Sequence, residues 1–305
     1  MTDRTAVLVM AYGTPKTPAE IEGYYTRIRH GHAPTPEQLA DLTRRYDAIG
    51  GTSPLNERTA AQVAGIAAAL EAIEPGRYEV TFGAKYADPD IEAAAAQIVA
   101  DGAEQVVGLV LTPHFSTIGT GSYHSRARAA LGEDHPFNAI ERWWDAPGFA
   151  ELMADRVTAA LSSLDPEVAA KTLVLFTAHS LPAKVLEVGD PYPIELSRSA
   201  EVIAEAAGLE RFDVAWQSAG RTREPWLGPD ILQVVRALPE RGFDGVVICP
   251  VGFVSDHLEV LFDVDIEAKA VADEVGLTLV RTASLNDDPR FLSLLATVVA
   301  EAANA

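Results

Sequence analysis

Short runs of β-branched and other apolar residues alternate along this chain with longer stretches whose apolar positions recur at helical spacing. Apolar strands that alternate with helices are typical of parallel sheets covered by helices on both faces. The pattern therefore predicts an α/β fold. The expected strands are 5–11, 78–84, 105–112, 172–178, 212–217, 244–251 and 277–281. The expected helices are 18–30, 36–48, 57–73, 89–101, 121–131, 147–163, 191–207, 229–239, 256–274 and 288–303.

The chain also repeats part of its own pattern. Pro-Asp-Ile occurs with its aspartate at Asp90 and again at Asp230, an offset of 140 residues, and a glycine and a Val-Val pair follow at the same distances. The shared register predicts two similar halves, 1–150 and 151–305, with the last helix (288–303) free to pack back onto the first half. In open α/β sheets ligands bind beyond the carboxyl ends of the strands, so we expect a site in a cleft between the halves.

The charge of the chain narrows the possible ligands. The 305 residues carry 24 Lys and Arg against 44 Asp and Glu, a net charge of −20, which argues against nucleic acid and anionic membranes. Residues 1–60 are balanced, with seven basic and seven acidic side chains, and contain a local cluster of arginines. Such a cluster suits a small anionic ligand, although arginines on a solvated helix face give the same pattern. The arginines of the cluster are Arg27, Arg29, Arg44 and Arg45.

The single cysteine, Cys249, excludes a disulfide framework, a zinc ribbon and a four-cysteine iron–sulfur cluster. No apolar run reaches the length of a membrane span, and the first residues lack the features of a secretion signal. We therefore expect a cytoplasmic protein.

Several polar residues follow directly after expected strands, whereas phosphate-binding, dinucleotide, nucleophile-elbow and zinc-protease signatures are missing. The polar residues after the expected strands include Tyr12, His114, His179 and His257. A histidine on a loop after a strand is well placed for acid–base or metal chemistry, and the alternative is a structural histidine that binds its own loop. For His179 the functional interpretation is favoured, because its neighbours Ala178 and Ser180 are small.

An acidic row occupies the stretch after His257. Glu259, Asp263 and Glu267 are spaced by four residues, which places them on one face of an α-helix. Like charges at this spacing repel each other by a few tenths of a kcal/mol per pair. The row is either a solvated acidic face or a set of carboxylates that attracts a divalent cation or relays protons. Apolar neighbours on most of the helix favour the second interpretation.

With these segments together, the chain resembles the ferrochelatase family, and within it the cluster-free form that acts on coproporphyrin III. The resemblance runs nearly end to end. It rests on VLVMAYGTP (7–15), YYTRIRHG (24–31), RYDAIGGTSPL (45–55), PHFST with SY after it (113–123), TAHSLP (177–182), GDPYP (189–193), WQSAGRT with PWLGPD (216–230) and PVGFVSDHLEVLFDVDIE (250–267).

The resemblance implies two Rossmann-like halves and the insertion of ferrous iron into a porphyrin, most readily coproporphyrin III, in haem b biosynthesis. It implies catalytic and metal-binding roles for His179 and Glu259, and outer metal ligands at Asp263 and Glu267. The positions that match residues lining the macrocycle are Tyr12, Arg29, Arg45, Tyr46, Ser53 and Tyr123.

On this basis Fe2+ is a substrate, no cofactor is tightly bound and no iron–sulfur cluster is present. A later enzyme of the haem pathway is a possible partner for the product. Three alternatives stay open: a chelatase acting on protoporphyrin IX or another tetrapyrrole, a two-lobed tetrapyrrole-binding protein without catalysis, and a haem carrier in which Tyr12 binds the product iron.

Overall fold

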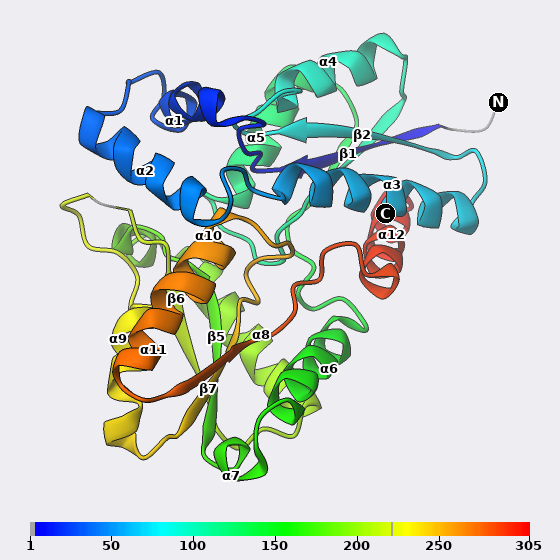
Figure 1. The fold of residues 1–305 in the computed structure, drawn as a ribbon. Coiled ribbons are helices and arrows are strands. Elements are labelled where there is room, and N and C mark those ends of the chain that lie inside the picture. The colour runs from blue at the N-terminus through cyan, green and yellow to red at the C-terminus, as the bar shows by residue number, and fades with distance from the viewer. Residues whose placement is uncertain (1–3, 221) are drawn as a thin grey trace. The chain divides into compact units, whose positions relative to one another are not determined.

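The chain forms two compact units, each built on a four-stranded parallel sheet (Figure 1). A computed structural model describes residues 4–220 and 222–305 of the protein. Unit 1 comprises residues 1–146, 255–258 and 285–305, and unit 2 comprises residues 147–254 and 259–284. The chain therefore passes from one unit to the other several times, and its last helix belongs to unit 1. Among the described residues, no helix is long and apolar enough to cross a membrane.

The sheet of unit 1 has the strand order β2-β1-β3-β4. Its strands are β1 (Thr5–Ala11), β2 (Tyr78–Ala84), β3 (Gln105–Val110) and β4 (Phe137–Ile140). Strand β1 is buried along its whole length, because it lies inside the sheet and helices cover both of its faces.

Helices cover the two faces of this sheet separately. Alternate β1 residues, from Ala6 to Met10, pack against α4 (Ile91–Ala100) and α5 (Thr120–Leu131). On the other side α3 (Leu55–Ile73) contacts β2, and α12 (Pro289–Ala303) contacts α3, β3 and β4 (Figure 1). The remaining helices of the unit are the 3-10 turn η1 (Pro18–Glu20), α1 (Ile21–Ile28) and α2 (Pro36–Ala48).

The sheet of unit 2 has the equivalent order β6-β5-β7-β8. Its strands are β5 (Thr172–His179), β6 (Phe212–Gln217), β7 (Gly245–Cys249) and β8 (Thr278–Arg281). One face packs against α9 (Ile231–Ala237) and the helical region 258–274, and the other lies under α6 (Phe149–Ser162) and α8 (Tyr192–Ala206). Short helical turns complete the unit: α7 (Pro166–Ala169), η2 (Ala183–Leu186) and η3 (Pro239–Arg241).

The predicted internal repeat is confirmed by the matching strand order of the two sheets. It also extends to individual contacts. Asp90 caps α4 by accepting a hydrogen bond from the backbone N–H of Ala93 (2.7 Å), and Asp230 caps α9 by accepting one from Leu232 (2.8 Å). Each aspartate therefore begins the helix that follows the second strand of its sheet.

The strands expected from the sequence are all present. The structure adds strand β4 and the short helical turns α7 and η2, and it divides one expected helix into three parts. Strand β4 was not predicted, because it has only four residues, lies at the sheet edge and contains the polar Asn138. The expected helix 256–274 consists of α10 (Leu258–Phe262), a π-helix (Asp263–Ala268) and α11 (Lys269–Glu274). The prediction of one regular α-helix is therefore wrong in this stretch.

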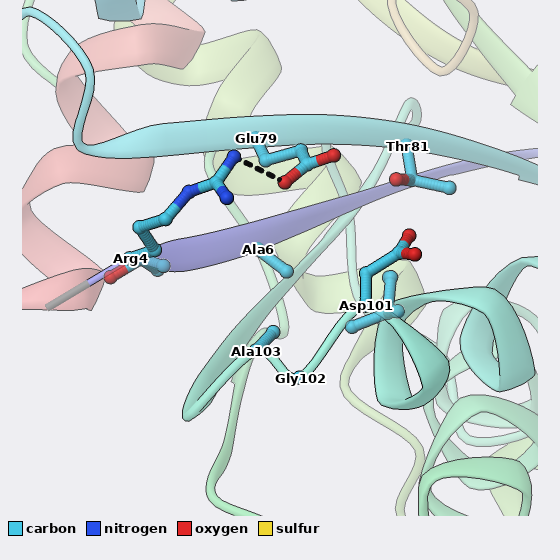
Figure 2. Close-up of a pocket in the computed structure, with 9 residues that line it drawn as sticks. Arg4, Ala6, Glu79, Thr81, Asp101, Gly102 and Ala103 are labelled. Atoms are coloured by element: carbon cyan, nitrogen blue, oxygen red, sulfur yellow. Dashed lines mark hydrogen bonds and ion pairs between the residues drawn. The ribbon is translucent and has the colours of Figure 1, made fainter.

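A small pocket lies at the amino end of β1, away from the carboxyl ends of the strands (Figure 2). Arg4, at its rim, forms an ion pair with Glu79 of β2 at 2.8 Å. The pocket has a volume of about 30 Å³. It is far too small for a tetrapyrrole.

Candidate functional site

His179 is the last residue of β5, at the carboxyl end of the unit 2 sheet. Its ring Nδ1 lies 2.5 Å from the carbonyl oxygen of Ser180. A carbonyl can only accept, so Nδ1 carries a hydrogen and donates it. The hydroxyl of Tyr192 in turn donates to the carbonyl of His179 at 3.2 Å. These contacts orient the ring and leave Nε2 as the atom available for chemistry.

The second member of the site is Glu259 on α10, which belongs to the same unit as His179. Its Oε1 lies 3.4 Å from Nε2 of His179, and both side chains are about one-third exposed (35% each). Two donor atoms at this separation can both reach one metal ion at the usual ligand distances of about 2.0–2.1 Å, with an angle of about 110° between them. The pair therefore suits either a shared proton or a shared metal ion.

The acidic surroundings favour a proton on His179. Burial by itself lowers the pKa of this imidazole, but the charge of Glu259 and the hydrogen bonds to Glu259 and Ser180, with a smaller contribution from Asp263, outweigh it. Together they raise the pKa of His179 from 6.5 to about 9. At neutral pH Nε2 is therefore protonated, and a metal ion must displace this proton before it can bind there.

The π-helix changes the geometry of the predicted acidic row. A π-helix closes i→i+5 hydrogen bonds, so the α-helical alignment of Glu259, Asp263 and Glu267 does not hold beyond the end of α10. Asp263 is buried (5% exposed) and accepts a short hydrogen bond from the hydroxyl of Ser218, whereas Glu267 is partly exposed.

No group of three or more His, Cys, Asp or Glu side chains in residues 4–220 and 222–305 is arranged to hold a metal ion. Metal binding by Asp263 and Glu267 therefore stays a prediction. Cys249 is buried, and this burial raises the pKa of its thiol to about 12, so it does not offer a thiolate.

In unit 1, several residues that the sequence assigned to porphyrin binding gather around the loop after β1. The ring of Tyr12, 41% exposed, meets the ring of Tyr86 edge-on at 4.9 Å. The hydroxyl of Tyr46, a buried residue of α2, lies 2.9 Å from the hydroxyl of Thr14, two residues beyond Tyr12. The buried Tyr123 of α5 lies under the ammonium group of a lysine next to Tyr86.

The remaining residues of this set have mainly local partners. The Arg45 guanidinium pairs with Asp41 at 3.2 Å on α2, and the Nε of Arg29 donates to the carbonyl of His32 at 3.3 Å. Ser53 is buried and accepts a hydrogen bond from the backbone of Leu55 at 3.3 Å. Through its hydrogen bond to Thr14, Tyr46 is held at the loop that carries Tyr12. The cleft expected between the halves stays a prediction.

One residue of this region was missed by the sequence analysis. Lys85 follows β2, donates to the hydroxyl of Ser122 at 2.6 Å and lies over the rings of Tyr86 and Tyr123. Burial, with a smaller effect of Arg126, lowers the pKa of Lys85 to about 8. A basic residue directly after a strand, beside a tyrosine, was the signal available in the sequence.

The surroundings of His114 differ from those of His179. His114 is buried (1% exposed), and burial lowers its pKa to about 3, so the ring is neutral at physiological pH. This contrasts with His179, whose acidic neighbours raise its pKa.

Known proteins are similar to this chain over nearly its whole length. The family model described as Ferrochelatase matches residues 4–303. A protein named Ferrochelatase from Herpetosiphon aurantiacus is 46% identical over 98% of this chain and 99% of the relative. The chain belongs to the ferrochelatase family. Relatives named Coproporphyrin III ferrochelatase from Halalkalibacterium halodurans and Bacillus subtilis are each 44% identical to this family member, covering 97% of its length and 96% and 97% of theirs.

Solved structures show the same fold. The structure of SirB from Bacillus subtilis with Fe3+ matches with a TM-score of 0.58 at 12% identity, covering 98% of this ferrochelatase chain and 96% of the other. CbiX, the terminal enzyme of sirohaem biosynthesis in denitrifying bacteria, matches with a TM-score of 0.54 at 15% identity, covering 97% and 98%. The predicted fold of two parallel-sheet halves is therefore confirmed.

The charge coupling within the pair can be tested by titrating His179. In the Glu259→Gln variant the neighbouring negative charge is gone, so we expect the pKa of His179 to fall from about 9 toward 6.5. Ring-proton NMR across pH 5–10 measures it, with the His179→Ala spectrum assigning the resonance. A titration of His179 near 6.5 in both the original protein and the variant would contradict the coupling.

Proposed function

We propose that this chain inserts ferrous iron into coproporphyrin III and releases coproheme, as a step of haem b biosynthesis. The observation that carries the proposal is the His179–Glu259 pair, with Nε2 and Oε1 separated by 3.4 Å at the carboxyl end of the unit 2 sheet. The relatives named for coproporphyrin III support the choice of substrate.

The chemistry needs a metal donor and a proton acceptor in one place. Insertion forms bonds from iron to the ring nitrogens, breaks two N–H bonds and releases two protons, without any change in oxidation state. Imidazole and carboxylate hold a divalent metal less firmly than thiolates would, so the metal can pass on to the porphyrin. After the metal has left, Nε2 of His179 and the Glu259 carboxylate accept the protons.

The high pKa of His179 affects both the uptake of protons from the porphyrin and the binding of the metal. It makes the imidazole a strong proton acceptor at the moment when the pyrrole N–H groups lose their protons. It also makes the proton compete with the incoming metal, so metal affinity rises with pH up to about 9. Asp263 and Glu267 then serve as further carboxylates on the metal's path.

Residues of unit 1 supply the porphyrin side of the proposal. Coproporphyrin III carries four propionates, and arginine forms strong charge-assisted hydrogen bonds with carboxylates. We assign Arg29 and Arg45 to the propionates, and Tyr12 to the face of the ring. Tyr46, Ser53 and Tyr123 complete this set; because they are buried, we assign them to supporting the binding surface.

Two alternatives make different predictions. A chelatase for protoporphyrin IX would share the His179–Glu259 pair and differ only in the propionate contacts. A tetrapyrrole-binding protein or haem carrier would bind its ligand at one equivalent without turnover, and it gives no reason for a protonated histidine facing a carboxylate. The proposal also places the protein in the cytoplasm, without an iron–sulfur cluster, upstream of an enzyme that accepts coproheme.

The choice of substrate is tested by anaerobic iron insertion into coproporphyrin III and protoporphyrin IX, followed by absorbance. We expect kcat/KM to be higher for coproporphyrin III, because four propionates offer the arginines more partners than two do. Faster insertion into protoporphyrin IX would favour the first alternative. Stoichiometric binding of both porphyrins without turnover would contradict a catalytic function.

The role of His179 is tested by His179→Ala. Loss of the metal ligand and proton acceptor should reduce kcat by at least about a hundredfold, the lower end expected for a general base. Porphyrin affinity, measured by fluorescence quenching, should stay within about twofold because the propionate contacts remain. The matched control is His114→Ala, a buried histidine of unit 1 with no assigned role in insertion. A His179→Ala variant that keeps its kcat would remove this residue from the mechanism.

A further inference from the structure

A buried glutamine at the end of β6 connects the two members of the catalytic pair. Gln217 has no exposed surface and lies opposite His179 in the β5–β6 register. Its backbone carbonyl accepts a hydrogen bond from the N–H of Ser180 at 2.7 Å. Gln217 is thereby fixed to the strand end that carries the catalytic imidazole.

The side chain of Gln217 extends the connection to Glu259. Its Nε2 donates to the backbone carbonyl of Glu259 at 3.1 Å, and its Oε1 accepts from the hydroxyl of Thr177 at 2.8 Å. Thr177 is fully buried on β5, two residues before His179. A buried amide is costly unless both of its ends are bonded, and here one end is bonded to the His179 strand and the other to the Glu259 helix.

The next residue holds the following turn of the same helix. Ser218 has a φ of 60°, a left-handed conformation that residues other than glycine rarely adopt unless their surroundings hold them. In this conformation its hydroxyl donates to the carboxylate of Asp263. Gln217 and Ser218 therefore contact positions four residues apart, Glu259 and Asp263.

These two contacts bracket the change from α-helix to π-helix, since α10 ends at Phe262 and the π-helix begins at Asp263. A third restraint comes from β8, where the Arg281 guanidinium forms two hydrogen bonds with Asp265, at 2.7 and 3.0 Å. Side chains from the strand ends thus hold a π-helical segment that differs from the commoner α-helix.

We propose that Gln217 is a positioning residue for metal insertion. Its amide holds the backbone of Glu259 so that the carboxylate of Glu259 stays close to the imidazole of His179. The inference deepens the proposed function and rests on it. Loss of the amide contact lets α10 shift, so that Oε1 of Glu259 and Nε2 of His179 no longer converge on one metal ion. Such a shift weakens metal binding and slows insertion, because reacting groups misplaced by about 1 Å lose up to a hundredfold in rate. Porphyrin contacts in unit 1 are untouched.

The direct test is Gln217→Leu, which keeps a similar volume and removes both amide contacts. We expect kcat for iron insertion to fall by about tenfold to a hundredfold, with KM for the porphyrin within about twofold. The matched control is Val174→Ala, which truncates a buried side chain near the start of β5, the strand that carries His179. It should lower the melting temperature and leave kcat within about twofold. Equal kcat losses in the two variants would reduce Gln217 to a core residue and overturn the inference.

A second pair of variants keeps the test valid if Gln217→Leu does not fold. Thr177→Val removes only the hydroxyl that holds Oε1 of Gln217, and Thr177→Ser keeps that hydroxyl. We expect the valine variant to lose kcat and the serine variant to retain it. Identical kcat values for these two variants would contradict the positioning role.

Zn2+ binding to the protein without porphyrin separates this inference from the proposed function. Calorimetry should show that Zn2+ binds Gln217→Leu at least about fivefold more weakly than the original protein. The His179→Ala variant gives the Zn2+ affinity that remains when the His179–Glu259 pair is removed. Unchanged Zn2+ affinity overturns the inference whether or not the original protein inserts iron. Weakened Zn2+ affinity in a protein that metallates no porphyrin supports the positioning role and overturns the proposed function.

Discussion

The function proposed for this ferrochelatase family member depends on one charge interaction, between the imidazole of His179 and the carboxylate of Glu259 at 3.4 Å. Burial alone would favour a neutral ring, and the acidic neighbours reverse this preference and raise its pKa to about 9. A site that binds a proton firmly in the absence of metal is also a site where a divalent cation can replace it. In the proposed function, the same interaction prepares His179 for metal binding and for proton uptake.

The fold creates this interaction from elements that are distant in sequence. His179 lies at the carboxyl end of β5, where open parallel sheets usually bind ligands, and Glu259 follows the connection after β7. The register between β5 and β6 places Gln217 opposite His179, and its amide reaches the Glu259 carbonyl. The pair thus depends on the packing of two neighbouring strands and one helix within unit 2.

Much of the fold could be predicted from the sequence, because buried parallel strands consist of continuous apolar runs. In addition, Asp90 and Asp230 occur at equivalent positions of the repeat and begin equivalent helices. His179 was also identifiable, since a histidine between small residues at a strand end is well placed for chemistry. The π-helix was not, because apolar spacing of the α-helical type continues across it, and its contacts with Ser218 and Arg281 join residues that are distant in sequence. Gln217 was missed for a similar reason: its role arises from strand register, which a local pattern does not contain.

The most direct test of this account counts the protons released when metal binds. Zn2+ binding to the protein without porphyrin is measured by calorimetry at pH 7 in buffers of different ionisation enthalpy. If Nε2 of His179 is protonated by its acidic surroundings, binding should release about one proton per metal ion, and His179→Ala should abolish this release. Metal binding at the same site without proton release would contradict the claim that a proton and the metal compete for His179.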